Sequence, residues 1–351
     1  MTCVLVALLI YFLPAFSQIN NGIKIIKEAD STSLSFQNRE YYKTVKLPFK
    51  AITVFDKRFD TTKIGYVKNN TKVQLEESFS TIINNYFKKN LDPASERSLI
   101  IFIKSFWIQK GVIDNILDKK IIESSIDGPG IGKPLYAPIN FDKAGSCTVV
   151  IETFASTNST IKSLFKIDTF FLNLSMGFRK NNVDELFFLP FDSLARKIAT
   201  TNIKGLIEKK RTLSWEQINN YYNTRFNIPL LKDSIIKKGI FLSFEDFKQN
   251  KPMEVEFRFS NGKLTDELYI VNGNSEILVA KYWGFYDGKN LFIQAGMSAF
   301  KAVQQQNTFE IFGSKHVTNY HNNPQQGDIK LISFGLDNKI LQVNMDTGKL
   351  Y

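Results

Sequence analysis

The last third of the chain alternates between short runs of β-branched or aromatic residues and clusters of turn residues. This pattern is typical of an all-β region, because such side chains favour extended backbone and the turn residues end each strand after a few positions. The runs expected to form strands are Gly239–Phe244, Met253–Phe259, Lys263–Val271, Glu276–Tyr286, Asn290–Ala295, Thr308–Phe312, Ile329–Leu336 and Lys339–Met345. Asp337 and Asn338 lie between the last two runs, as in a hairpin turn. We therefore predict a β-rich domain over residues 238–351.

Residues 45–215 mix two periodicities. Extended patterns cover Lys50–Val67, Ser98–Ile108, Cys147–Phe154 and Leu164–Leu174, and helical spacing covers Val73–Leu91 and Ser193–Lys210. We expect the second helix to begin after Pro190, since proline interrupts a helix interior. The sequence thus predicts an α+β protein with a sandwich-like mixed domain over 45–215, a connection over 216–237 and the β-rich domain after it.

The N-terminus has the pattern of a cleaved signal peptide. Cys3–Leu13 is continuously apolar, and small residues at Ala15 and Ser17 precede Gln18. Eleven residues are too few to span a bilayer core, which needs about 20. We expect residues 1–17 to be removed, 18–44 to form a polar lead-in, and the mature chain to be exported without an integral membrane segment. The predicted location is periplasmic or outer-membrane-associated.

Cysteine and histidine are scarce. The two Cys and two His exclude a disulfide framework and a Cys-rich zinc site. Cys147 lies in a strand-like segment and reads as a buried thiol, while His316 and His321 read as loop residues. The loop from Gly128 to Pro134 lacks the Ser or Thr that follows Lys in a phosphate-binding loop. We expect no metal and no cofactor.

Acidic pairs offer the remaining candidates for catalysis. One polar cluster comprises Asp56, Arg58 and Asp60, and it reads either as an ion-pair cluster at a strand end or as an acid/base pair. Two further pairs are Glu245 with Asp246 and Glu254 with Glu256. The common hydrolase motifs are missing from the sequence. The sequence therefore favours a protein without catalytic activity and leaves a carboxylate-dependent hydrolase as the alternative.

The string KYWGFYDGKNLFI carries the most distinctive group of aromatic residues. Its candidate ligand or partner contacts are Tyr282, Trp283, Phe285, Tyr286 and Asp287. If exposed, these rings could stack on sugars or seat a partner protein. Strand alternation offers the other interpretation, in which the rings fill the β core and the Asp-Gly pair forms a turn.

The chain is basic. It carries 45 Lys and Arg against 34 Asp and Glu, which gives a net charge of +11. Most of these cations are dispersed along the sequence, and dispersed charge gives a weak attraction to anionic surfaces. We expect no nucleic-acid partner, whereas an envelope protein or an anionic envelope glycan would suit this composition.

Two segments carry a resemblance. ITVFDKRFDTTKIGY (Ile52 to Tyr66), with FLPFDSLARKIA, resembles the N-terminal region of uncharacterised exported proteins of Bacteroidota. KGIFLSFEDFKQNKP (Lys238 to Pro252), followed by YWGFYDGKNLFI, resembles a C-terminal module of the same proteins. This resemblance implies export and carries no assigned activity.

The sequence as a whole predicts an exported cell-envelope or surface protein that acts as a non-catalytic binding or interaction module. An envelope-glycan-binding protein or a carboxylate-dependent hydrolase is the alternative. A purely structural envelope protein is a third reading. A binding module would tolerate single replacements of acids such as Asp56 or Glu245, whereas an enzyme would lose turnover with at least one of them.

Overall fold

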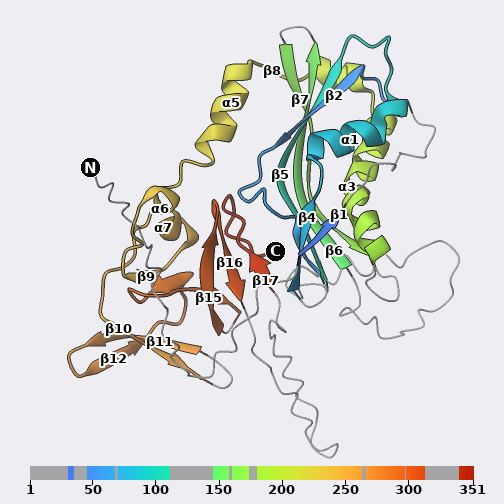
Figure 1. Ribbon diagram of the computed structural model, residues 1–351. Coiled ribbons are helices and arrows are strands. Elements are labelled where there is room, and N and C mark those ends of the chain that lie inside the picture. Colours follow the sequence, from blue (N-terminus) through green and yellow to red (C-terminus); the bar gives the residue numbers. More distant parts are fainter. Residues whose placement is uncertain are drawn as a thin grey trace, which may run out of the picture.

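The computed structural model describes residues 31–34, 46–67, 70–110, 145–157, 160–173, 180–262, 266–296, 298–312 and 340–351. They form an α+β protein in which a curled mixed sheet with helices is followed by antiparallel β-sheets, as the sequence predicts (Figure 1). The segments containing Gly128, His316, His321 and Asp337, and the expected signal peptide, lie outside the described residues.

The first sheet is built around three long strands that run antiparallel to one another. Its strand order is β1-β4-β3-β5-β6-β7-β8, and β2 pairs in parallel with β5. The strands are β1 (Ser31–Leu34), β2 (Ala51–Asp56), β3 (Gly65–Val67), β4 (Thr71–Leu75), β5 (Ser98–Lys110), β6 (Gly145–Thr157), β7 (Thr160–Asn173) and β8 (Thr212–Leu213). Strand β5 and most of β6 are buried on both faces, which explains why Ser98–Ile108 reads as an almost continuous apolar run.

Helices cover one face of this sheet and form the largest core with it (Figure 1). They are α1 (Phe79–Phe87), the 3-10 turn η2 (Lys88–Asn90), α3 (Lys180–Thr200) and α4 (Ile203–Glu208). Phe79 of α1 stacks on Phe187 of α3, and both rings contact Phe106 of β5. Aromatic packing therefore joins the two helices to the long strands.

Two expectations about these helices are wrong. Val73 was expected on the helical face, but it lies in β4 and packs into the same core from a strand. The second helix begins at Lys180, so Pro190 lies inside it. Proline removes one backbone hydrogen bond. Phe187 and Phe191, on either side of Pro190, are fully buried against the sheet, and this packing holds the helix together across it.

Residues 216–237, expected as a connection, contain helices that belong to both parts. They are α5 (Trp215–Thr224) and α6 (Pro229–Lys232). Ile218 and Tyr222 of α5 pack on the second face of the first sheet, where Phe102 stacks on Tyr222. Leu230 of α6 packs into the core of the second part.

The C-terminal part is β-rich, as predicted, and consists of two antiparallel sheets. The six-stranded sheet has the order β17-β16-β15-β14-β13-β9, and the small sheet has the order β10-β11-β12. The elements are β9 (Gly239–Phe241), α7 (Phe244–Lys248), β10 (Phe257–Asn261), β11 (Asp266–Asn272), β12 (Ser275–Leu278), β13 (Gly284–Tyr286), β14 (Leu291–Ala295), β15 (Ser298–Gln305), β16 (Thr308–Phe312) and β17 (Ile340–Gln342). Strand β15 was not expected, because Lys301, Gln304 and Gln305 make its second half mostly polar.

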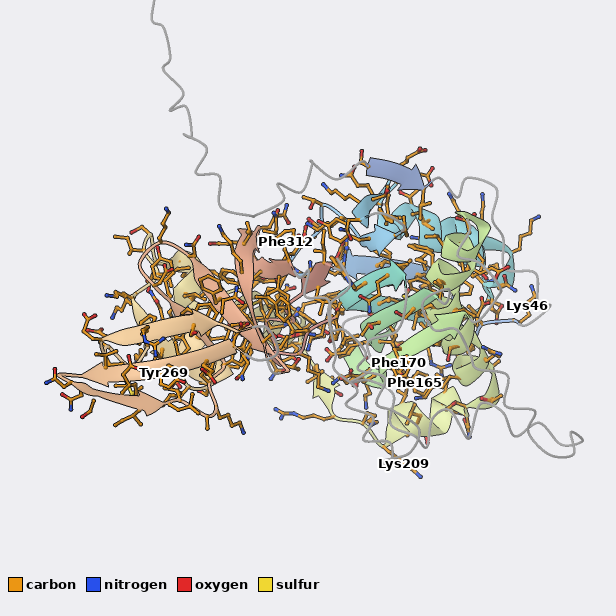
Figure 2. The ribbon with its side chains drawn as sticks, turned by 90° about the horizontal axis from the view of Figure 1, so that it is seen from below. Lys46, Phe165, Phe170, Lys209, Tyr269 and Phe312 are labelled. Atoms are coloured by element: carbon orange, nitrogen blue, oxygen red, sulfur yellow. The ribbon has the colours of Figure 1, made fainter. Side chains whose placement is uncertain are left out.

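The six-stranded sheet is covered on both faces. Helices α6 and α7 pack on one face, where Phe247 and Phe309 meet in the core. The small sheet packs on the other, where Phe259 contacts Phe285. Figure 2 shows the small sheet, marked by Tyr269, at the end of the molecule remote from Phe165 and Phe170 of the first sheet.

Cys147 lies in β6 and is buried, as the sequence predicts. Burial raises the pKa of its thiol well above the ordinary value, because a thiolate is poorly solvated there. Within the described residues, no helix is both long enough and apolar enough to cross a membrane.

Candidate functional site

The two parts of the molecule meet at the loop between β2 and β3. Phe59 in this loop is buried in the core of the C-terminal part and contacts Phe226. The carbonyl of Phe59 accepts a hydrogen bond from the backbone N–H of Asn307, and the N–H of Thr61 donates to the Gln306 side chain at 3.1 Å. The loop DKRFDTTK, noticed in the sequence for its acids, is thus the segment that joins the parts.

A buried charge cluster lies beside this loop. Lys63 Nζ is 2.9 Å from Asp60 Oδ2 and 2.9 Å from Glu310 Oε1, and all three side chains are nearly inaccessible to solvent. Tyr66 donates to Glu310 Oε2 at 3.0 Å. Because Glu310 belongs to β16, the cluster connects the first sheet with the six-stranded sheet.

The candidate polar cluster Asp56, Arg58 and Asp60 is divided between two roles. Arg58 is buried and donates from Nε and Nη2 to the Asp56 carboxylate, at 2.9 and 2.7 Å. It also donates to the carbonyl of Lys63. Asp60 pairs with Lys63 and accepts from the N–H and hydroxyl of Thr62. These side chains therefore hold the shape of the loop and the junction beside it.

A second buried cluster lies on the α5-facing side of the first sheet. Lys104 of β5 donates to Glu152 of β6 at 3.2 Å and to the hydroxyl of Tyr221 at 2.9 Å. Tyr222 donates to the other oxygen of Glu152 at 2.5 Å. Burial, followed by the hydrogen bond to Glu152 and the negative charge of that carboxylate, raises the pKa of Tyr222 far above its ordinary value.

The C-terminal turn completes this second cluster. Arg225, at the end of α5, pairs with the Asp346 carboxylate through Nε and Nη2, the shortest contact being 2.7 Å. Arg225 Nη1 donates to the carbonyl of Lys57, and Lys104 Nζ lies 3.8 Å from Asp346. Two separate segments, β5 and the end of α5, thus supply the donors to one pair of carboxylates, Glu152 and Asp346.

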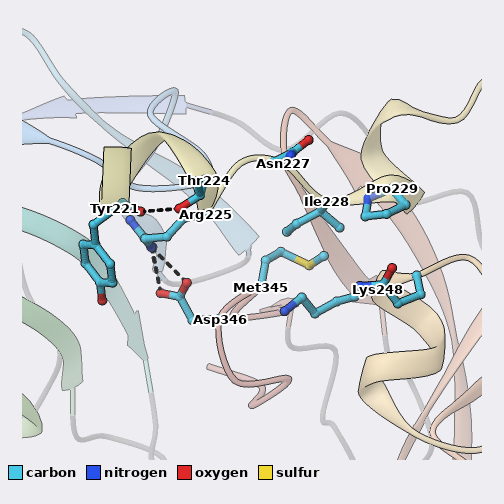
Figure 3. Close-up of a pocket in the computed structure, with 10 residues that line it drawn as sticks. Tyr221, Thr224, Arg225, Asn227, Ile228, Pro229, Lys248, Met345 and Asp346 are labelled. Atoms are coloured by element: carbon cyan, nitrogen blue, oxygen red, sulfur yellow. Dashed lines mark hydrogen bonds and ion pairs between the residues drawn. The ribbon is translucent and has the colours of Figure 1, made fainter. Parts of the chain in front are cut away.

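A cavity of about 220 Å³ opens beside Arg225 (Figure 3). Ile228 and Met345 form its apolar surface, and Lys248 of α7 extends toward it from the opposite side to Arg225 (Figure 3). The cavity also borders Asn227 and Gln249. Asp346 borders it too, so the cavity combines two cations and one carboxylate with amide groups and a small apolar floor.

The aromatic string lies in the two cores of the C-terminal part. Tyr282 and Phe285 pack under the small sheet, whereas Trp283 and Tyr286 pack on the side of α7. Asp287 is exposed and accepts from the N–H groups of two residues that follow it, which forms the turn into β14. Ligand or partner contact by these residues stays a prediction.

The other acidic pairs lie on the surface. Asp246 forms a capping box with Ser243 at the start of α7, and Glu245 is exposed. Glu254 and Glu256 are exposed and alternate with more buried neighbours, as expected for one solvated side of an extended segment. In the part of the chain that the structure describes, no three or more His, Cys, Asp or Glu side chains are grouped to hold a metal ion.

The small sheet has an open edge at β12. Among the residues that the structure describes, no strand pairs with the outer side of β12, and all four of its residues are exposed. Ile277 is 59% and Leu278 53% exposed, which is unusual for adjacent apolar residues in a strand.

No protein-family model, curated protein or solved structure matches this chain.

The sequence reasoning missed most members of the two charge clusters. Lys104 interrupts SLIIFIKSFWI, Glu152 interrupts CTVVIETF, and Glu310 interrupts TFEIF. A single charge inside an apolar strand is a usable signal, because a buried charge requires a partner. The identity of each partner carries no such signal, since it lies far away in the sequence.

We predict that removing the ammonium group of Lys63 greatly destabilises the folded protein. Lys63→Met should lower the free energy of unfolding by about 3–5 kcal/mol at neutral pH, because two buried carboxylates lose their counter-charge. Urea denaturation measures the change. Lys166→Met is the matched control, since the Lys166–Asp168 pair is about half exposed and should contribute below about 1 kcal/mol. Equal losses in both variants would contradict the assignment.

We predict that Glu310 makes the free energy of unfolding depend on pH in a defined direction. Burial raises the pKa of its carboxyl more than Lys63 lowers it, so the folded pKa lies above the unfolded one. The unfolding free energy contributed by this group is therefore fully present below the unfolded pKa and falls as the pH rises through the folded pKa. Glu310→Gln should flatten this part of the profile, measured by urea denaturation from about pH 4 to 7. An unchanged slope would argue against a raised pKa.

Proposed function

We propose that this chain is an exported, non-catalytic interaction protein of the cell envelope or surface, periplasmic or outer-membrane-associated, that binds an extended segment of a partner protein along β12. The observation that carries the proposal is the open edge of the small sheet with its two exposed apolar residues. A partner strand can extend such a sheet through main-chain hydrogen bonds.

The hydrogen-bond pattern of β12 identifies the groups that a partner strand would meet. β12 pairs antiparallel with β11, with Ile277 opposite Ile270 and Glu276 opposite Val271. The N–H of Val279 donates to Leu268, so the hydrogen-bonded positions are 279, 277 and 275. The intervening residues, Glu276 and Leu278, direct their backbone groups toward the open edge.

The alternation of side chains along β12 indicates which residue types a partner strand would carry. Ile277 continues the apolar face that Phe259 and Ile270 use to pack on the six-stranded sheet. Leu278 lies on the opposite face, opposite Tyr269, which lies under the Arg258 guanidinium. Glu276 is paired with Arg258 at 2.6 Å. A partner strand with apolar residues on both faces would bury Ile277 and Leu278 and leave this ion pair intact.

The state of the acids in the two charge clusters supports binding over hydrolysis. Asp60, Glu310, Glu152 and Asp346 each lie beside a Lys or Arg, and two of them also accept from tyrosine hydroxyls. A general acid or base must reach a substrate proton, and these carboxylates are engaged within the protein. Export is supported by the apolar stretch Cys3–Leu13 and the small residues before Gln18.

Ile277→Lys tests the edge, because an inward-pointing charge is how natural sheets block strand addition. In-cell crosslinking of a C-terminally tagged full chain should capture a discrete partner protein, and this variant should lose it. Val303→Lys is the matched control, since Val303 is also exposed and apolar but lies in β15, inside the six-stranded sheet. Capture that survives Ile277→Lys would overturn the edge proposal, and recovery of glycan alone would favour a glycan-binding protein.

Export has a separate readout. The intact mass of the recovered chain should correspond to an N-terminus at Gln18, because signal peptidases cleave after small residues such as those at Ala15 and Ser17. The intracellular fraction of the same cells provides the control. A recovered chain that retains residues 1–17 would contradict export and would leave the β12 result unaffected.

A further inference from the structure

The cavity beside Arg225 is lined by two cations, Arg225 and Lys248, and by one carboxylate, Asp346, which is already paired with Arg225. It is separate from β12. We propose that it binds the carboxylate group of a small ligand, such as one acidic sugar unit. The binding groups would be Lys248 and Arg225, with Met345 and Ile228 against the body of the ligand (Figure 3).

Lys248 supplies the first cation. Its side chain is 23% exposed, so most of it is withdrawn from water. Its closest acidic partner among the described residues is Glu245 at 3.6 Å, which is beyond hydrogen-bonding distance, and Glu245 itself is 65% exposed. The ammonium group has three N–H donors for an incoming acceptor. A largely covered ammonium with a distant, solvated counter-ion favours an anionic ligand.

Arg225 supplies the second cation, and its guanidinium is already held in one orientation. Its guanidinium has five N–H donors, and Nε and one N–H on each terminal nitrogen serve Asp346 and the carbonyl of Lys57. Each terminal nitrogen keeps one further N–H, on a guanidinium that is 6% exposed and lies over the rings of Phe59 and Phe226. The pair with Asp346 fixes the plane of the guanidinium, so little conformational entropy is lost when it binds a ligand.

The size and floor of the cavity limit the ligand. Its volume of about 220 Å³ is below the roughly 300–1,000 Å³ of pockets that hold drug-sized molecules. Buried Ile228 and Met345 offer an apolar surface, and Asn227 and Gln249 offer amide groups at the border. One small ring with a single carboxylate matches this combination of charge, polarity and space.

The test is calorimetric titration of the full chain with sodium glucuronate, an oligomer of the same acid, glucose and inorganic phosphate. Glucuronate should bind and glucose should not, because the sugar ring is shared and the carboxylate is the difference. Equal binding per unit by the free acid and the oligomer would support a small free acid as the ligand, and tighter binding by the oligomer would support an acidic glycan. Phosphate that binds as tightly as glucuronate would overturn the carboxylate assignment.

Two variants distinguish this site from general attraction to a basic protein. Lys248→Gln should weaken glucuronate binding by about tenfold or more, the change expected for loss of one charge-assisted hydrogen bond. Lys248→Arg keeps the charge and should retain most of the affinity. Lys251→Gln removes the same charge from an exposed position nearby and should have little effect. Equal losses in the two Gln variants, or no heat of binding at millimolar glucuronate, would overturn the proposal.

Discussion

Two lysines buried between the two parts of the molecule are the constraint on which the rest of the structure depends. A buried ammonium costs several kcal/mol unless carboxylates lie beside it. Lys63 has Asp60 and Glu310, and Lys104 has Glu152 with Asp346 further away. Each lysine thus has one carboxylate from the first sheet or its loop and a second from the C-terminal part. The second carboxylate can reach the lysine only when the two parts dock in this arrangement.

A local irregularity in β5 keeps apolar residues on both sides of Lys104 in the helix-covered core. Between Ile103 and Ser105 the register with β6 shifts by one residue, so two residues of β5 stand opposite one of β6. Strict alternation would carry the later residues of β5 onto the wrong face. Lys104 lies on the α5-facing side with Phe102, as alternation requires, and contacts Glu152 there. The bulge returns Phe106 to the helix-covered core that Ile103 also enters. One extra residue therefore separates the apolar and ionic surfaces of a strand buried on both faces.

The sequence predicts the layers well and the junction poorly, for a physical reason. Periodicity is a local property, so the strands of the β-rich part and the buried thiol of Cys147 follow from it. The helix through Pro190 does not, because packing on both sides of the proline overrides a local preference. Charge pairing depends on residues more than a hundred positions apart, such as Arg225 and Asp346. The motif Asp56 to Asp60 was noticed for its acids, yet its neighbour Lys63 makes the long-range contact.

This architecture also places the two proposed binding features. Separating the parts would break the pair between Lys63 and Glu310, and Glu310 would lose its cation while Lys63 would keep only Asp60. Opening the junction is therefore costly, and the junction acts as a rigid base. The charged side chains inside the junction are paired with one another and are not available to bind a ligand. Binding must therefore use groups that the junction orients but does not fully pair, such as the remaining N–H groups of Arg225, or an edge remote from the junction, such as β12. The ion pairs that make these carboxylates unavailable for acid or base catalysis therefore also provide the rigidity that binding requires.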